Sequence, residues 1–228
     1  MSMEMIAVAI GIKGRQAIFR EVVAALARQS AARSINLLLL DGSETEVFRP
    51  GSEVEAFASI RMWRESEVIH PDLRGRWPAL YNFLLNQTTD PYLCYWSDVT
   101  PDHPRCFQSA ATLLAQKPKL GAVCYPWRNG SGARLHIYRT ERFDQPLLNF
   151  GLVRREAFRD VGGLDERYHF YYADQDFSLR LWKKGWEVDA TERDGLAVTH
   201  LLGEKSDNLY RQPEWTAMDR STFHDTWG

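Results

Sequence analysis

Two aspartates at the start of one apolar segment are the first residues whose spacing suggests chemistry. Asp174 and Asp176 lie near the beginning of YYADQDFSLRLWKKGWEV, residues 171–188. Each residue of an α-helix turns the chain by about 100°, so carboxylates two positions apart point about 200° apart and cannot share a face. Asp176 precedes Arg180 by four residues, the order in which an acid and a base pair along a helix. Asp174 then has no local partner and is available for another role.

Two more aspartates, and one histidine, lie at the ends of apolar runs. Asp41 closes INLLLLD, Asp98 closes PYLCYWSD, and His200 closes LAVTH. Open α/β sheets bind ligands at the carboxyl ends of their strands, so one cleft could hold Asp41, Asp98 and Asp174. Each aspartate also has an ordinary structural explanation, as a turn residue, an Asx turn or a helix N-terminal acid. His200 is either a metal ligand or a polar residue at a strand end.

Apolar runs alternate with helical periods along the chain. Residues 6–12 and 35–41 are nearly unbroken apolar runs, and residues 16–30 between them carry a helical period. Strands without polar alternation are typical of a parallel sheet covered on both faces. We therefore predict a single α/β domain, residues 1–228, with a mostly parallel central sheet flanked by helices. Further helices are expected at 77–86, 107–116, 155–163 and 174–184, and further strands at 91–98, 121–127, 135–139 and 147–154.

Composition excludes several classes of protein. Among 228 residues, 44% hydrophobic content is enough for a sizeable core, and 28 basic against 30 acidic residues disfavour nucleic-acid binding. The three cysteines lack CxxC spacing, which indicates neither a disulfide framework nor a thiolate zinc site. No apolar run approaches the ~20 residues of a transmembrane segment, and the N-terminus lacks the charge pattern of a signal peptide. We expect a cytoplasmic protein.

Two polar segments lack a readable period. Residues 128–134, RNGSGAR, are rich in glycine, asparagine and serine and are expected to form a loop. Residues 203–228 are polar and aromatic, and we expect a mobile C-terminal tail or lid there.

In this order, the segments resemble the inverting family 2 glycosyltransferases, which have the GT-A fold and use nucleotide-diphosphate sugars. The resemblance runs from about Val8 to His200. Its most specific part is LVRREAFRDVGGLDERYHFYYADQDFSLRLWKKGW, similar to the family's block of a strand, an REAF helix, a GGxDE loop and an acidic helix start followed by LxxRxxxxG. The resemblance implies metal-dependent transfer of a sugar, with a UDP-sugar as the expected donor, to an acceptor hydroxyl of a sugar, lipid or protein.

The resemblance also implies roles for residues of the N-terminal half. The stretch AIGIKGR is similar to the family's first nucleotide loop, which implies donor contacts for Gly11, Lys13 and Arg15. Asp41, in LLLLDGS, falls where the family binds the uracil ring. Arg76, in GRWPALYN, falls where the family has a basic contact to the nucleotide.

The remaining roles implied by the resemblance concern the diphosphate and the acceptor. Asp98, in YLCYWSDV, falls on the family's DxD or DD motif, against the ribose and the metal-bound diphosphate. His200, in VTHLLGEKS, falls on the late histidine that completes the metal shell. The metal would be Mn²⁺ or Mg²⁺, bound together with the nucleotide. Asp174 falls on the general base.

Two departures from the family pattern leave a second interpretation open. The motif at Asp98 reads DVT, so Val99 and Thr100 stand where another carboxylate would help to bind the metal. Ala173 replaces the glutamate that usually precedes the base. The alternative function is therefore a protein of the same fold that binds UDP or a nucleotide sugar with little or no transfer.

Overall fold

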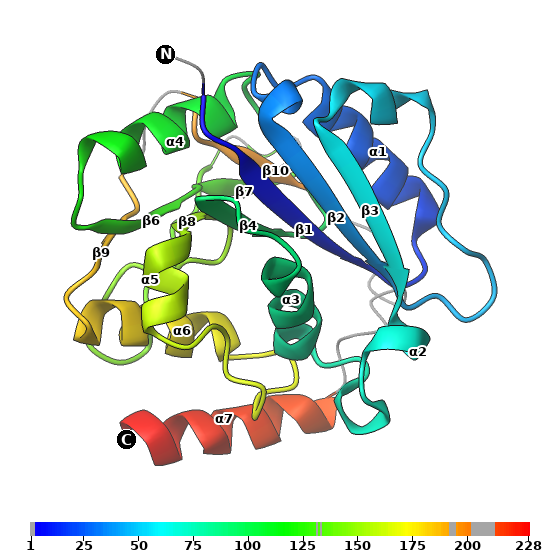
Figure 1. Ribbon diagram of the computed structural model, residues 1–228. Coiled ribbons are helices and arrows are strands. Elements are labelled where there is room, and N and C mark those ends of the chain that lie inside the picture. The colour runs from blue at the N-terminus through cyan, green and yellow to red at the C-terminus, as the bar shows by residue number, and fades with distance from the viewer. Residues whose placement is uncertain (1–2, 131, 133, 192–194, 202–212) are drawn as a thin grey trace.

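A twisted sheet forms the centre of the molecule (Figure 1). The structure, a computed structural model, describes residues 3–130, 132, 134–191, 195–201 and 213–228. The strands of the central sheet are β1 (Ile6–Ile12), β2 (Ile35–Asp41), β3 (Ser59–Arg64), β4 (Tyr92–Trp96), β6 (Leu120–Cys124), β8 (Gly151–Arg154) and β9 (Glu187–Asp189). Their order is β3-β2-β1-β4-β8-β6-β9, and β8 alone runs antiparallel to its neighbours. The mostly parallel sheet predicted from the apolar runs is confirmed.

Side chains of β1 alternate between two buried layers. Ile6, Val8 and Ile10 belong to the cluster that packs under α1 (Gln16–Ala27) and α4 (Cys106–Gln116). Ala7 and Ala9 belong to the cluster on the opposite face. That face is covered by α3 (Trp77–Asn86), α5 (Arg155–Asp160) and α6 (Ala173–Lys183). Burial on both faces explains why the strand shows no polar alternation. Short helical turns lie at Ala32–Ser34, Ser52–Ala56, Glu65–Val68 (α2) and Pro71–Leu73.

A second, small sheet joins segments that are far apart in sequence. It consists of β5 (Val99–Pro101), β10 (Val198–His200) and β7 (Trp127–Asn129), in the order β5-β10-β7. The loop expected at 128–134 therefore begins with two residues of a strand. Conversely, the strand expected at 135–139 forms only isolated bridges, at His136 and Arg139, within the described part of the chain.

The C-terminal segment differs most from expectation. Residues 213–227 form the helix α7 (Pro213–Trp227), which lies along the segment that precedes α6 (Figure 1). The polar sequence showed no helical period, so this helix was not predicted; a lid role remains a prediction, and residues 203–212 lie outside the described part. Phe223 of α7 is fully buried in a cluster with Tyr168, Tyr172 and Leu179. None of the described helices has both the length and the apolarity needed to cross a bilayer.

Candidate active site

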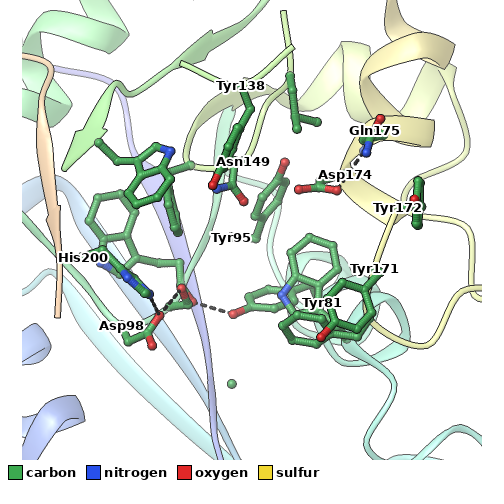
Figure 2. A pocket seen from close by; sticks show the side chains of 18 of the residues that line it. Tyr81, Tyr95, Asp98, Tyr138, Asn149, Tyr171, Tyr172, Asp174, Gln175 and His200 are labelled. Carbon is green, nitrogen blue, oxygen red and sulfur yellow. Dashed lines mark hydrogen bonds and ion pairs between the residues drawn. The ribbon is translucent and has the colours of Figure 1, made fainter. Parts of the chain in front are cut away.

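A cavity of about 570 Å³ opens where the central sheet, the small sheet and the start of α6 meet. Its lining includes Asp98 and His200 on one wall and Asp174 on another. Figure 2 shows these two walls with the rings of Tyr81 and Tyr95 between them. Of the three aspartates expected to share one cleft, Asp98 and Asp174 line this cavity, whereas Asp41 does not, so the expectation is wrong for Asp41.

The first wall is a compact group of charges around Asp98. Arg15 Nη2 lies 2.8 Å from Asp98 Oδ2, and His200 Nε2 lies 3.3 Å from Oδ1. Ser97 Oγ also donates to Oδ1 at 2.9 Å. Burial raises the pKa of Asp98, but the hydrogen bond and charge of His200, followed by Arg15 and Ser97, outweigh it and hold this pKa well below its usual range. The carboxylate is therefore ionised at any working pH.

Strand pairing in the small sheet brings this group together. His200 pairs with Val99 in the antiparallel register of β10 and β5, so its ring reaches the residue just before that strand, Asp98. The Leu201 amide donates to the Asp98 carbonyl at 2.8 Å, which fixes the same register. Arg15 approaches from the other side at the start of α1, in a left-handed conformation with φ 52°. Such a conformation is uncommon for a residue with a side chain.

The second wall is the first turn of α6. Asp174 is partly buried there, and its Oδ1 accepts a hydrogen bond of 2.9 Å from the Gln175 amide. Among the described residues no cation forms an ion pair with this carboxylate. Burial raises the pKa of Asp174 to about 6, although hydrogen bonds from the backbone amides of Gln175 and Asp174 partly oppose the shift. Asp174 is thus a carboxylate that can exchange a proton near neutral pH.

The ion pair predicted between Asp176 and Arg180 is confirmed. Arg180 Nε lies 2.7 Å from Asp176 Oδ2, as the four-residue spacing predicted. Asp176 is 1% exposed, and its Oδ1 also accepts a hydrogen bond of 2.9 Å from Trp227 Nε1 in α7. Asp176 therefore holds the helix in place, whereas Asp174 lines the cavity.

Asp41 lies outside the cavity lining. It is 0% exposed, and its carboxylate accepts hydrogen bonds from the amides of Ser43 at 2.9 Å and Phe48 at 2.7 Å. Arg64 Nη1 completes the set at 2.7 Å. These contacts organise the loop that follows β2, in keeping with the turn-forming alternative. A contact between Asp41 and a nucleotide base remains a prediction.

We expect Asp41→Ala to affect folding more than ligand binding. The change takes the carboxylate away from Arg64 Nη1 and from two amides, and the expected loss in the free energy of unfolding is about 2 to 4 kcal/mol. Urea denaturation measures this loss, and UDP affinity of the remaining folded protein is expected to change less than about 3-fold. A normal unfolding free energy with a large loss of UDP affinity would instead assign Asp41 to the base.

The other predicted donor-binding residues divide between the cavity and its surroundings. Gly11 lines the cavity, and a Cβ there would lie 2.7 Å from the Leu80 side chain, so glycine lets the end of β1 approach α3. Arg76 instead donates from Nη1 to the Glu166 carbonyl at 3.1 Å, outside the lining. Lys13 is also outside the lining residues. Nucleotide contacts of Arg76 and Lys13 remain predictions.

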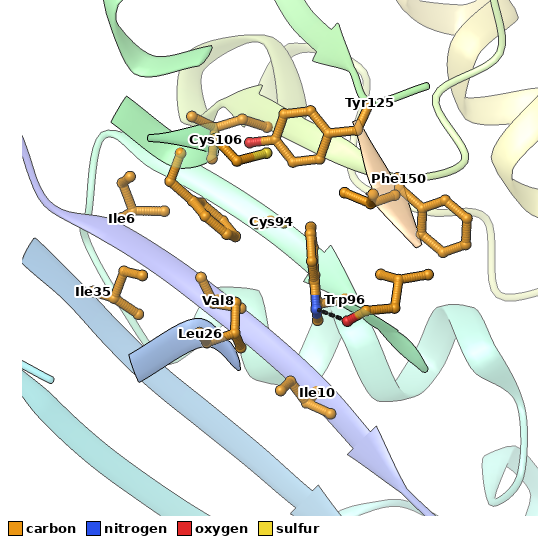
Figure 3. Packing of buried hydrophobic residues seen from close by; sticks show 14 of the residues in the cluster. Ile6, Val8, Ile10, Leu26, Ile35, Cys94, Trp96, Cys106, Tyr125 and Phe150 are labelled. Atoms are coloured by element: carbon orange, nitrogen blue, oxygen red, sulfur yellow. Dashed lines mark hydrogen bonds between the residues drawn. The ribbon is translucent and has the colours of Figure 1, made fainter. Parts of the chain in front are cut away.

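Of the residues that depart from the family pattern, Val99 and Ala173 are buried and Thr100 is half-buried. Val99 is 0% exposed, and its carbonyl accepts a hydrogen bond of 3.0 Å from Trp96 Nε1 within the apolar cluster of Figure 3. Ala173 is 0% exposed in the cluster beneath α7. Among the described residues no three His, Cys, Asp or Glu side chains gather as a metal site. Asp98 Oδ1 and His200 Nε2 are two adjacent donors, which fit a divalent cation that takes its other ligands from phosphate and water.

Several aromatic side chains of the cavity were not predicted from the sequence. Tyr81 and Tyr95 form its floor, and burial raises the pKa of both phenols, so they stay protonated. Both donate to backbone carbonyls, Tyr81 to that of Trp96 and Tyr95 to that of Leu148. An aromatic residue in an apolar strand such as β4 is expected to belong to the hydrophobic core. Only the position of the cavity shows that Tyr95 also lines a site.

Comparisons with known proteins agree with this architecture. No protein-family model matches the sequence. A 56-residue segment, 22% of the chain, is 46% identical to N-acetylglucosaminyl-diphospho-decaprenol L-rhamnosyltransferase from Mycobacterium tuberculosis, of which it covers 18%. The chain spans less than a fifth of the length of the curated relatives it matches.

Solved structures match nearly the whole chain. The mannosyltransferase PcManGT from Pyrobaculum calidifontis, in complex with GDP-Man and Mn²⁺, superimposes with a TM-score of 0.68 at 12% identity, covering 98% of this chain and 65% of that one. The fold is GT-A. TarS from S. aureus, residues 1–349 in complex with UDP, has a TM-score of 0.67 at 12% identity and covers 87% of this chain and 61% of its own. At such identities the GT-A fold is what these structures share with the chain.

Proposed function

We propose that the chain is an inverting glycosyltransferase that moves a sugar from a nucleotide-diphosphate donor, a UDP-sugar, to an acceptor hydroxyl. The observation that carries the proposal is one cavity with Asp98, Arg15 and His200 on one wall and Asp174 on another. Structures of similar fold bind GDP-mannose with Mn²⁺ or UDP, which supports a nucleotide donor. A nucleic-acid partner has no support in the charge balance of 28 basic and 30 acidic residues.

The wall around Asp98 suits the departing diphosphate. When the bond between the sugar and the β-phosphate breaks, its electron pair leaves with the phosphate, so negative charge grows on the leaving group. Arg15 can meet this charge directly, since its Nε is buried and has no hydrogen-bond partner among the described residues. Trp127 Nε1, a second buried donor of the lining, is likewise unpartnered there.

A divalent cation fits this wall together with the nucleotide. Asp98 and His200 would hold Mn²⁺ or Mg²⁺, which would neutralise the diphosphate as a Lewis acid. Before a nucleotide binds, the Arg15 guanidinium already neutralises Asp98 at 2.8 Å. We therefore expect the cation to bind strongly only when the diphosphate draws Arg15 away.

Asp174 suits the attacking side. The acceptor hydroxyl must lose its proton as its oxygen forms the new bond to the sugar, and the Asp174 carboxylate accepts that proton. Attack from the wall opposite the leaving group inverts the anomeric carbon. The raised pKa of about 6 makes Asp174 a stronger base than an ordinary aspartate while leaving it ionised at pH 7.

A second candidate function is binding without transfer. Val99 and Thr100 stand where the family pattern has a second metal-binding carboxylate, and Ala173 stands where it has a glutamate. A protein of this kind would bind UDP or a nucleotide sugar and leave it intact. The acceptor, whether a sugar, a lipid or a protein, and a location in the cytoplasm both remain predictions.

A thermal-shift screen separates the two candidates from an unrelated function. UDP, GDP and their sugars are each added with Mn²⁺, with Mg²⁺ or with EDTA. A ligand that binds only the folded state raises the free energy of unfolding, by about 2.7 kcal/mol at 100 times its Kd. The melting temperature rises as a result. We expect UDP with Mn²⁺ to give the largest shift. Slow hydrolysis of the matching UDP-sugar would favour the transferase, binding without turnover would favour the second candidate, and no shift with any nucleotide would contradict both.

A further inference from the structure

One face of α7 contacts the start of α6 along most of its length. Thr216, Asp219, Phe223 and Trp227 are spaced by three or four residues, so they lie on the same side of the helix. Thr216 lines the cavity, and the other three contact α6 or the segment 169–172 before it. The contact face of α7 is thus directed at the wall that carries Asp174.

Asp219 makes the densest set of these contacts. Its Oδ1 accepts a hydrogen bond of 2.8 Å from the His169 amide, and its Oδ2 accepts bonds from the amides of Phe170 at 2.9 Å and Tyr171 at 2.8 Å. His169 Nδ1 lies 3.0 Å from Oδ1. Asp219 is 0% exposed. A carboxylate this buried is tolerated because several donors satisfy it, and it binds all three consecutive amides at once.

The segment 169–172 is held from its other side by α3. The Trp77 amide, the first of that helix, donates to the His169 carbonyl at 2.7 Å. The His169 ring stacks on Trp215 of α7, with ring centroids 5.5 Å apart. The segment therefore lies between two helices, which pair the amides of residues 169–171 and the His169 carbonyl.

The residues so fixed are cavity residues. Phe170, Tyr171 and Tyr172 all line the cavity, and Tyr172 precedes α6 in a left-handed conformation with φ 62°. Arg220 Nε donates to the Tyr172 hydroxyl at 3.1 Å, and Phe223 packs on the Tyr172 ring at 5.0 Å between centroids. A strained backbone persists only where its surroundings hold it, and here α7 supplies most of them.

We propose that α7 is a latch for the attacking side of the cavity, and that Asp219 is a positioning residue for Asp174. Asp219 fixes the amides of 169–171, these fix Tyr172, and Tyr172 sets the first turn of α6 on which Asp174 lies. The second point of the latch is the bond from Trp227 to Asp176. The inference rests on the proposed function, because it assigns Asp174 the role of base.

Asp219→Asn tests the latch, with Asp225→Asn as its matched control on the exposed side of the same helix. The new amide turns one acceptor oxygen into an NH₂ group that faces backbone N–H donors, so the segment 169–172 must move. Because a displacement of about 1 Å can cost 10²-fold in rate, we expect kcat to fall about 10- to 100-fold. UDP affinity is expected to change less than about 2-fold, and Asp225→Asn is expected to change neither quantity.

Two measurements that need no catalytic turnover test the latch independently of the proposed function. Hydrogen exchange reports the protection of the amides of residues 169–171 directly, and we expect it to fall at least 10-fold in Asp219→Asn. The pKa of Asp174, read by carboxyl NMR, is expected to fall from about 6 toward 3.8 as water enters. If both stay unchanged in Asp219→Asn, the latch is wrong, whereas absence of any turnover in the wild type contradicts only the proposed function.

Trp227→Phe is a second test of the latch, for the case in which Asp219→Asn does not fold. It keeps an aromatic ring on α7 and removes the donor to Asp176. We expect a smaller fall in kcat, about 3- to 10-fold, with unchanged UDP affinity. Equal losses of UDP affinity and kcat in Trp227→Phe and Asp219→Asn would mean that α7 supports the whole fold, and would overturn a specific role at the attacking side.

Discussion

Asp174→Asn is expected to lower kcat for sugar transfer or donor hydrolysis by about 10² to 10⁴-fold, the usual contribution of a general base. Asparagine keeps the shape of the side chain and cannot take a proton. UDP affinity is expected to stay within about 2-fold, because Asp174 lies on the wall away from Asp98 (Figure 2). Steady-state kinetics with a UDP-sugar and calorimetry with UDP measure the two quantities.

The pH dependence of the wild type provides a second check on the base. Asp174 acts in its ionised form, so kcat is expected to rise with pH through about 6, the raised pKa of this carboxyl, and to level off above it. The small remaining activity of Asp174→Asn should lack this rise. Asp72→Asn is the control, since the Asp72 side chain is 86% exposed and lies outside the cavity lining. Near-normal turnover in Asp174→Asn would remove Asp174 from the mechanism.

The same substitution is expected to stabilise the fold at neutral pH. The pKa of Asp174 is raised from 3.8 to about 6 on folding, so between these pH values the folded state binds more protons than the unfolded state. Stability therefore falls as pH rises through this window. Asparagine does not ionise, so we expect it to raise the free energy of unfolding by roughly 1 to 3 kcal/mol at pH 7 and by little at pH 4. Urea denaturation at both pH values tests the sign.

The features that the sequence predicted correctly depend on local geometry and burial. The apolar runs of β1 and β2 identify strands buried on both faces, because burial itself removes the polar alternation. The pair between Asp176 and Arg180 follows from helix geometry alone. Gly185, predicted just past the end of α6, has φ +86°, a conformation that glycine adopts without strain. Each of these features depends on residues close in sequence.

Features that depend on distant partners could not be predicted in this way. The helix α7 has a regular contact face, but this face includes Asp219 and Trp227, whose partners lie 48 to 51 residues away in the sequence. Polar residues on a buried face hide the apolar period by which a helix is recognised. Asp41 is the reverse case, because a carboxylate at the end of a strand suggests a ligand, whereas its three donors lie in the following loop and in β3.

The group around Asp98 gives the second large expected effect. Asp98→Asn removes the negative charge between Arg15 and His200 and replaces one of the two protein donors proposed for the cation, a carboxylate, by a weaker amide oxygen. We expect Mn²⁺ to strengthen UDP binding by the wild type, and this gain to fall about 10- to 100-fold in the variant, as when a metal shell is disturbed. Calorimetry of UDP with Mn²⁺ and with EDTA measures the gain. Asp102→Asn is the control, since Asp102 pairs with Arg128 at 2.9 Å outside the cavity lining.

The result in EDTA distinguishes the two roles of Asp98. If this carboxylate acted only as a structural partner of Arg15, its loss would weaken UDP binding with or without the cation. In our proposal Asp98 instead competes with the diphosphate for the Arg15 guanidinium, so releasing Arg15 leaves an unopposed positive charge beside the phosphates. Asp98→Asn is therefore expected to bind UDP in EDTA at least as tightly as the wild type. A loss of affinity in EDTA as large as that in Mn²⁺ would exclude the cation from this wall and leave Arg15 as a fixed structural partner of Asp98.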